Sequence, residues 1–103
     1  MIKHIVFSNF KEEAGGRSKL ENIATARTML LNLLGKVPTL RSMQAGPNAA
    51  CSGTAWDFAL VAEFDSMEAL EEYVVHPEHK KVSAFMSEVR SDRAFVDFEF
   101  DIT

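Results

Sequence analysis

Cysteine, proline and long apolar runs are scarce in this chain. Its 103 residues include one cysteine, Cys51, and three prolines. A single cysteine cannot form an internal disulfide, so nothing in the sequence calls for an oxidising compartment. No apolar run approaches the roughly 18–20 residues that a membrane helix needs, and the first ten residues lack the features of a signal peptide. We therefore expect a cytoplasmic protein with no membrane partner.

Positive charge is also in short supply. Lys and Arg number 11 against 15 Asp and Glu, which gives a net charge of −4. Nucleic acids and anionic membrane surfaces select clustered basic residues, so we expect this chain to bind neither. No histidine, cysteine or carboxylate spacing matches a known metal motif, and we expect no metal and no cofactor. The remaining composition, 47% hydrophobic and 25% charged, is that of one globular domain over residues 1–103.

Hydrophobic periodicity predicts strands and helices in a definite order. Alternating apolar residues predict strands over 2–10, 40–45, 56–64 and 94–100, and helical spacing predicts helices over 18–35, 65–75 and 77–89. Loops are expected over 11–17 and 48–55, and a polar turn over 90–93. This order is the split βαβ arrangement of ferredoxin-like folds. The predicted class is α+β, with a four-stranded antiparallel sheet and helices on one face.

The predicted helix starts rest on capping signals. Ser18 with Glu21, and Asp65 with Glu68, fit the capping box, in which two side chains satisfy free amides of the first turn. His76 precedes a proline that suits the first helical position, so His76 is expected to cap the third helix. The buried stripe of the first helix is predicted to be Leu20, Ile23, Ala24, Leu30, Leu31 and Leu34.

The sheet face opposite the helices is expected to be apolar. Such a patch is rarely exposed on a soluble monomer, and two sheets packed face to face would bury it. We therefore predict a homodimer with a two-fold interface, built on Ile5, Phe7, Ala59, Val61, Val96, Phe98 and Phe100.

Polar side chains are predicted to converge between the helices and the sheet. His79 heads the apolar face of the third helix, and Tyr73 ends the preceding one. His79 can act as a general base near neutral pH, and Tyr73 can donate a hydrogen bond to a developing enolate oxygen. His4 and Asp97 would orient them. The expected substrate pocket is lined by Val6, Phe58, Leu60, Val82, Phe85 and Phe95.

Each of these polar residues also has a purely structural interpretation. His79 fits a hydrogen-bonded core histidine, Tyr73 a core aromatic, and His4 a partner of Asp97 or of a carbonyl group. Two functions therefore remain open: a small-molecule enzyme or binding protein, and a non-catalytic stress or scaffold protein with a filled pocket. A solvent-connected cavity of ~300 Å³ or more beside His79 would favour the first, and a packed interior the second.

Several segments resemble the stress-responsive dimeric α/β-barrel (Dabb) domain family. They are residues 2–7 (IKHIVF), 35–41 (GKVPTLR), 63–66 (EFDS), 73–79 (YVVHPEH) and 95–98 (FVDF). The resemblance implies a dimer of ferredoxin-like subunits whose two sheets form a barrel. Many members have no known activity, but olivetolic acid cyclase closes a linear polyketide without a cofactor, and other dimeric barrels of similar fold are cofactor-free monooxygenases.

The resemblance to the cyclase is partial at the working residues. The cyclase uses a tyrosine and the second histidine of an HPxH motif, which match Tyr73 and His79 here. A further tyrosine and a further histidine of the cyclase are replaced by Leu30 and Phe58. The resemblance therefore implies a less polar pocket and a different polyketide-like or aromatic substrate.

Overall fold

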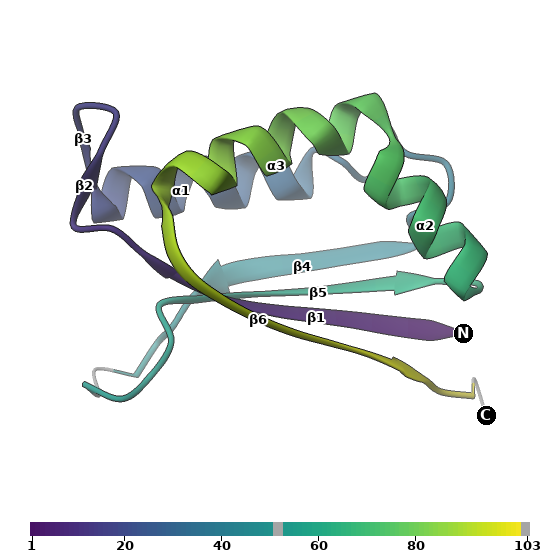
Figure 1. Ribbon diagram of the computed structural model, residues 1–103. Coiled ribbons are helices and arrows are strands. Elements are labelled where there is room, and N and C mark those ends of the chain that lie inside the picture. Colours follow the sequence, from purple (N-terminus) through teal and green to yellow (C-terminus); the bar gives the residue numbers. More distant parts are fainter. Residues whose placement is uncertain (51–52, 102–103) are drawn as a thin grey trace.

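The computed structural model describes residues 1–50 and 53–101, so Cys51 lies outside the described residues. Four strands form one antiparallel sheet in the order β4-β5-β1-β6. The three helices lie together on one face of it, and the start of β1 lies beside the end of β6 (Figure 1). The predicted fold class is thereby confirmed. The bounds are β1 (Ile2–Phe10), α1 (Lys19–Leu31), β4 (Ser42–Pro47), β5 (Phe58–Phe64), α2 (Met67–Val75), α3 (Pro77–Val89) and β6 (Arg90–Glu99).

The segment expected to be a loop after β1 contains a small hairpin. Strands β2 (Glu13–Ala14) and β3 (Arg17–Ser18) pair across Gly15 and Gly16. Both glycines have positive φ, 61° and 76°, which suits the right-handed twist of a two-residue hairpin turn. Asn22 of α1 is fully buried and holds the hairpin in place. Its Oδ1 accepts from Arg17 Nε at 2.8 Å and its Nδ2 donates to the Ala14 carbonyl at 3.2 Å.

The predicted caps of α1 and α3 are confirmed, whereas the predicted cap of α2 is wrong. Ser18 and Glu21 form the expected capping box. Ser66, and not Asp65, caps α2, because its hydroxyl accepts from the Ala69 amide at 3.1 Å. Asp65 instead pairs with Arg41 at 2.6 Å. His76 caps α3 as expected, since its Nδ1 accepts from the Glu78 amide at 3.1 Å.

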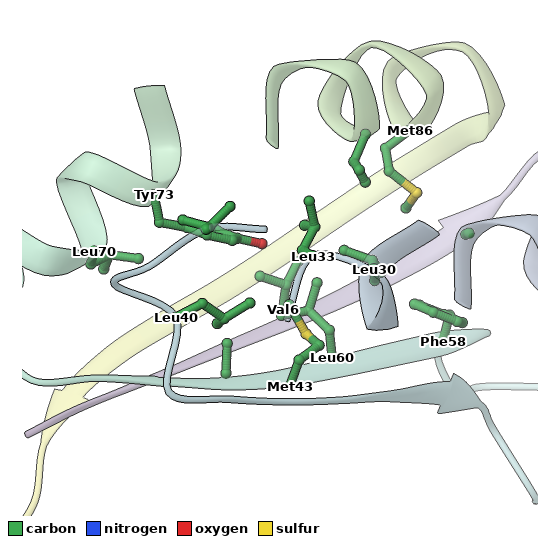
Figure 2. Packing of buried hydrophobic residues seen from close by; sticks show 14 of the residues in the cluster. Val6, Leu30, Leu33, Leu40, Met43, Phe58, Leu60, Leu70, Tyr73 and Met86 are labelled. Atoms are coloured by element: carbon green, nitrogen blue, oxygen red, sulfur yellow. The ribbon is translucent and has the colours of Figure 1, made fainter. Parts of the chain in front are cut away.

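The core lies between the helices and the sheet (Figure 2). The predicted stripe of α1 is wrong at Ala24, which is exposed, and at both ends, because Leu20 is 77% exposed and Leu34 48% exposed. Asn22 and Ala26 are buried instead, which rotates the buried face of the helix. The helix also ends at Leu31, short of the expected end at residue 35.

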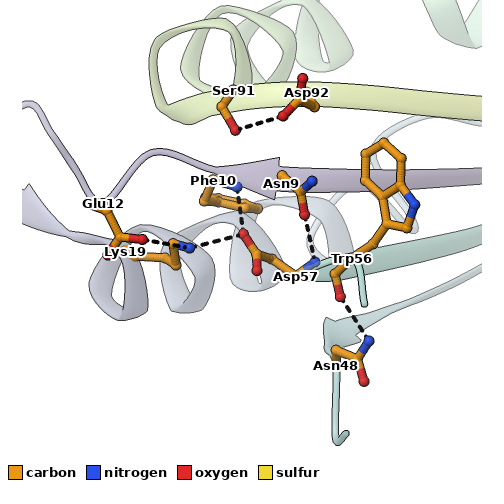
Figure 3. Close-up of polar contacts among 9 residues, drawn as sticks. All are labelled: Asn9, Phe10, Glu12, Lys19, Asn48, Trp56, Asp57, Ser91 and Asp92. Carbon is orange, nitrogen blue, oxygen red and sulfur yellow. Dashed lines mark hydrogen bonds and ion pairs between the residues drawn. The ribbon is translucent and has the colours of Figure 1, made fainter. Parts of the chain in front are cut away.

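Polar contacts connect β1, β5 and α1 at one end of the sheet (Figure 3). Asp57 Oδ2 accepts from the Phe10 amide at 2.8 Å and lies 3.3 Å from Lys19 Nζ. The Asp57 amide donates to Asn9 Oδ1 at 3.0 Å. These contacts join the end of β1, the start of β5 and the first turn of α1. They fix the strand register on which the site depends.

The other face of the sheet carries exposed apolar side chains, together with the polar residues Lys3, Glu63 and Gln44. Phe7, Val96 and Phe98 are 41%, 50% and 42% exposed. Val96 pairs with Ile5, and Phe98 with Lys3, so these side chains share the face away from the helices. The polar turn expected over 90–93 is absent, because β6 begins directly at Arg90. None of the described helices is both long and apolar enough to cross a membrane.

Candidate functional site

A cavity of about 210 Å³ lies under α2 and α3, against β1 and β5. Its lining includes exposed side chains, Ser83 and Arg93, so it opens to solvent. The volume is below the ~300 Å³ expected of a typical ligand site. The lining residues are His4, Val6, Ser8, Leu30, Leu60, Tyr73, Val74, His79, Val82, Ser83, Met86, Arg90 and Arg93.

His79 is held in one tautomer by the helix break. Pro77 starts α3 just after α2 ends, and His79 Nδ1 lies 3.1 Å from the Val74 carbonyl. A carbonyl only accepts hydrogen bonds, so Nδ1 carries the proton and donates it, which leaves Nε2 as an acceptor. Burial lowers the pKa of His79 below its usual 6.5; the Val74 carbonyl opposes this, and the nearby His4 adds to it. His79 is therefore neutral at pH 7 and able to take up a proton.

Tyr73 is stacked against this histidine. Their ring centroids lie 4.3 Å apart, with 48° between the ring planes. The Tyr73 side chain points from α2 into the core, with its hydroxyl directed at the centre of the cluster (Figure 2). That hydroxyl forms no hydrogen bond to any of the described residues. Burial raises the pKa of Tyr73 far above its usual 10, so the phenol stays protonated and can donate.

His4 and Asp97 form a buried pair beside these two rings. They face each other across the antiparallel strands β1 and β6, and His4 Nδ1 is hydrogen-bonded to Asp97 Oδ1. His4 lines the cavity, whereas Asp97 does not. Asp97 therefore orients His4, while the Val74 carbonyl orients His79.

Three of the six expected pocket residues line the cavity and three do not. Val6, Leu60 and Val82 contribute to it. Phe58 packs edge-on against Phe10 at 5.6 Å in the core, and Phe85 lies beside the Arg17 guanidinium. Phe95 pairs with Val6 and so faces the helical side, but it is 59% exposed. It belongs to the edge strand β6, where the helical layer leaves the sheet uncovered.

Sequence reasoning missed the charged part of the site. Arg90 and Arg93 line the cavity, and no aspartate or glutamate does. Arg93 pairs with Ser8 on β1, which puts both on the same sheet face as His4 and Val6. Side chains alternate along β6, so Asp97, Phe95 and Arg93 share one face. Extending the predicted strand back by this alternation would have placed Arg93 on that face. The polar composition of residues 90–93 concealed this continuation.

A larger cavity of about 360 Å³ lies elsewhere and is lined by Phe7, Gly46, Pro47, Asn48, Trp56, Phe58 and Ala59. It has no ionisable side chain, so it offers no group for acid–base chemistry. Within residues 1–50 and 53–101, no group of three or more His, Cys, Asp or Glu side chains could hold a metal ion. The cavity beside His79 brings two histidines and a tyrosine together, and it is the candidate site.

The fold and this site point to one family of barrel-forming proteins. The profile of the stress responsive A/B barrel domain (Dabb) matches residues 2–100, and the chain belongs to this family. A dimeric protein of unknown function and ferredoxin-like fold from Bacteroides fragilis is 30% identical. The match covers 96% of this chain and 95% of that one, with a TM-score of 0.85. No curated protein matches the chain.

Two more distant structures share the fold and have named activities. Hydroxynitrile lyase from Passiflora edulis is 14% identical, over 99% of this chain and 94% of that one, with a TM-score of 0.82. An antibiotic biosynthesis monooxygenase is 15% identical, over 99% of this chain and 100% of that one, with a TM-score of 0.70. At these identities the likeness concerns the fold alone.

Proposed function

We propose that this chain is a cofactor-free acid–base enzyme acting on a small polyketide-like or aromatic carbonyl compound. The observation that carries the proposal is the hydrogen bond between His79 Nδ1 and the Val74 carbonyl. It leaves Nε2 as the free acceptor of a neutral imidazole whose ring lies against Tyr73 in a solvent-connected cavity. A base and a hydrogen-bond donor are thus side by side.

The proposed reaction begins with proton transfer from carbon. His79 Nε2 takes a proton from the carbon next to the substrate carbonyl group, so a C–H bond breaks and an N–H bond forms. The electron pair moves onto the carbonyl oxygen as an enolate, which accepts a hydrogen bond from the Tyr73 hydroxyl. The enolate carbon then bonds to a second carbonyl group, whose oxygen takes the proton from His79 Nε2, or the enolate carbon takes that proton back itself; either course restores the neutral histidine. His4, oriented by Asp97, is a positioning residue at the cavity wall.

The subunits are proposed to act as a cytoplasmic homodimer. The exposed apolar face of Phe7, Val96 and Phe98 is the surface that a second sheet would cover. The Bacteroides fragilis relative is described as dimeric, which supports the same assembly here.

The test is a fragment screen by crystal soaking, using small aromatic ketones. The expected result is density in the cavity with a carbonyl oxygen within hydrogen-bond distance of the Tyr73 hydroxyl. His79→Ala should abolish turnover of any substrate found while leaving the oligomeric state intact. Lys80→Ala is the matched control, because Lys80 is an exposed residue of the same helix and does not line the cavity. Loss of turnover in the control alone would contradict the proposal.

A second function is favoured by the size of the cavity. At about 210 Å³ it is smaller than a typical ligand site. This supports a non-catalytic stress or scaffold protein in which the barrel is the functional unit. A cavity that stays empty of every fragment, in crystals whose solvent channels reach it, would favour this second function.

A further inference from the structure

Two arginines open onto the candidate site without an acidic partner. Arg90 and Arg93 line the same cavity as His79. In the part of the chain that the structure describes, neither guanidinium forms an ion pair with a carboxylate. The Arg93 guanidinium lies instead over the exposed ring of Phe95, 4.6 Å from its centroid.

The charge of the cavity is opposite to that of the chain. Its ionisable side chains, other than Tyr73, are all basic: His4, His79, Arg90 and Arg93. The chain as a whole has a net charge of −4. A local excess of positive charge in an acidic protein attracts and concentrates anions.

The acidic residues of β6 do not neutralise this charge. Asp97 is engaged by His4 Nδ1. Asp92 pairs with Asn9 on β1, whereas its neighbour Arg93 pairs with Ser8, so the two side chains point to opposite faces of the sheet. The carboxylate next to Arg93 in sequence is therefore turned away from the cavity.

The dipole of α3, the helix that precedes Arg90, compensates for only part of the positive charge of the cavity. Arg90 is the C-cap of α3, where the helix dipole contributes about half a negative charge. Burial and the neighbouring Arg93 lower the pKa of the Arg90 guanidinium, as expected of a cation without a counterion. Arg93 lies four residues beyond the end of the helix, within β6. Both cations thus remain available to a bound anion.

We propose that the site accepts a small organic acid whose carboxylate is held by Arg93 and Arg90. This inference rests on the proposed function and names its substrate class. The fork of a guanidinium matches a planar carboxylate, which it can bind through two parallel hydrogen bonds. The rest of the wall includes Val6, Leu60 and Met86, so the body of the ligand is apolar. A strongly hydrated polyanion such as phosphate would lose its water against these side chains.

The carboxylate and the reacting carbon then lie at different places in the cavity. Arg93 on β6 and His79 on α3 line the same cavity. An acid anchored on the arginines presents its carbonyl carbon to His79 and Tyr73. The arginines give orientation and affinity, and the histidine performs the proton transfer.

The test compares the binding of benzoate with that of benzamide, its uncharged counterpart, by titration of the histidine ring signals in NMR. The expected result is that benzoate binds at least about tenfold more tightly, since a charge-assisted hydrogen bond contributes on the order of 1.5–3 kcal/mol. Arg93→Gln should weaken the binding of benzoate by about tenfold and leave the binding of benzamide unchanged. Arg27→Gln is the matched control: Arg27 lies on α1, binds the Ala45 carbonyl at 3.0 Å and does not line the cavity.

Each other outcome overturns the inference in a recognisable way. Equal affinity for benzoate and benzamide, or equal effects of Arg93→Gln and Arg27→Gln, would overturn the organic-acid assignment and leave the proposed function standing. Displacement of benzoate by inorganic phosphate at equal affinity would show a site for any anion. Binding of neither compound, with the His79 signals unmoved, would count against the ligand and the proposed function together. Arg90→Gln is the second variant if Arg93→Gln fails to fold.

Discussion

The rings of Tyr73 and His79 lie 4.3 Å apart although a helix break separates them in sequence. The break makes the contact possible. His76 ends α2 and caps α3, and Pro77 sets the new helix direction, so the last turn of one helix faces the first turn of the next. The hydrogen bond from His79 back to Val74 closes this arrangement at 3.1 Å.

Tyr73→Phe should separate function from stability. Tyr73 is 1% exposed and lines the cavity, and its hydroxyl has no hydrogen-bond partner among the described residues, so its removal breaks no hydrogen bond while the ring keeps its packing. We expect stability in urea equal to or above that of the wild type, together with a loss of turnover of about 10²–10³-fold. A variant that loses stability by more than about 1 kcal/mol would show that the hydroxyl has a structural partner.

Asp97→Asn tests the pair that orients His4. The asparagine keeps the shape of the side chain but removes the charge from a partly buried hydrogen bond. We expect a loss of about 1.5–3 kcal/mol in the free energy of unfolding. Asp92→Asn is the control on the same strand, because Asp92 is exposed and faces the other side of the sheet. Equal losses in the two variants would mean that the His4 contact contributes nothing specific.

The helix caps give a prediction that distinguishes Ser66 from its neighbour Asp65 as the cap of α2. Ser18→Ala and Ser66→Ala should each destabilise the protein by roughly 0.5–2 kcal/mol, because each hydroxyl accepts from an amide of the first turn. Asp65→Ala should cost less, since it removes only an exposed ion pair with Arg41. Urea melts of the three variants are the measurement. A larger loss for Asp65→Ala than for Ser66→Ala would restore Asp65 as the cap.

Much of the fold was predictable because its signals are local. The alternation of β1 and β5 and the capping box at Ser18 are visible within a few residues. The stripe of α1 is not predictable from periodicity, because Asn22 is buried by its hydrogen bonds to the preceding hairpin, whereas Leu20 is exposed. Periodicity counts asparagine as polar and has no means of finding such a partner.

The candidate site was predictable only in its central residues. Tyr73 and His79 are near in sequence, and the helix faces bring them together. Arg93 reaches the site through its pairing with Ser8, which depends on the register between the first and last strands. Register between strands so far apart is set by packing and by cross-strand contacts such as that of His4 with Asp97. A single sequence does not contain it.

The apolar sheet face gives a prediction about assembly. Val61 pairs with Ile5 on β1 and with Gln44 on β4, and it lies at the middle of the face proposed to pack on a second subunit. Val61→Glu should split or unfold the dimer, because the carboxylate would be buried in an apolar interface. Light scattering at micromolar protein concentration is the check. A wild-type mass of 11.5 kDa would contradict the dimer.

The lowered pKa of His79 predicts a dependence of stability on pH. Between the folded pKa and 6.5, the unfolded chain binds more protons at this position than the folded chain. The contribution of His79 to stability is therefore present above pH 6.5 and is lost as the pH falls through the folded pKa. His79→Gln should flatten this part of the stability profile in urea melts recorded at successive pH values. An unchanged slope would place the titration elsewhere.

The most direct measurement of the central claim is the titration of His79 by ¹⁵N NMR, which reports both the ring tautomer and the pKa. The account predicts a neutral ring with the proton on Nδ1, an unprotonated Nε2 at pH 7, and a pKa below 6.5. His79→Gln serves to assign the signals. A proton on Nε2 in the neutral ring, or a pKa above 6.5, would contradict the account, because His79 would then lack a free basic nitrogen at neutral pH.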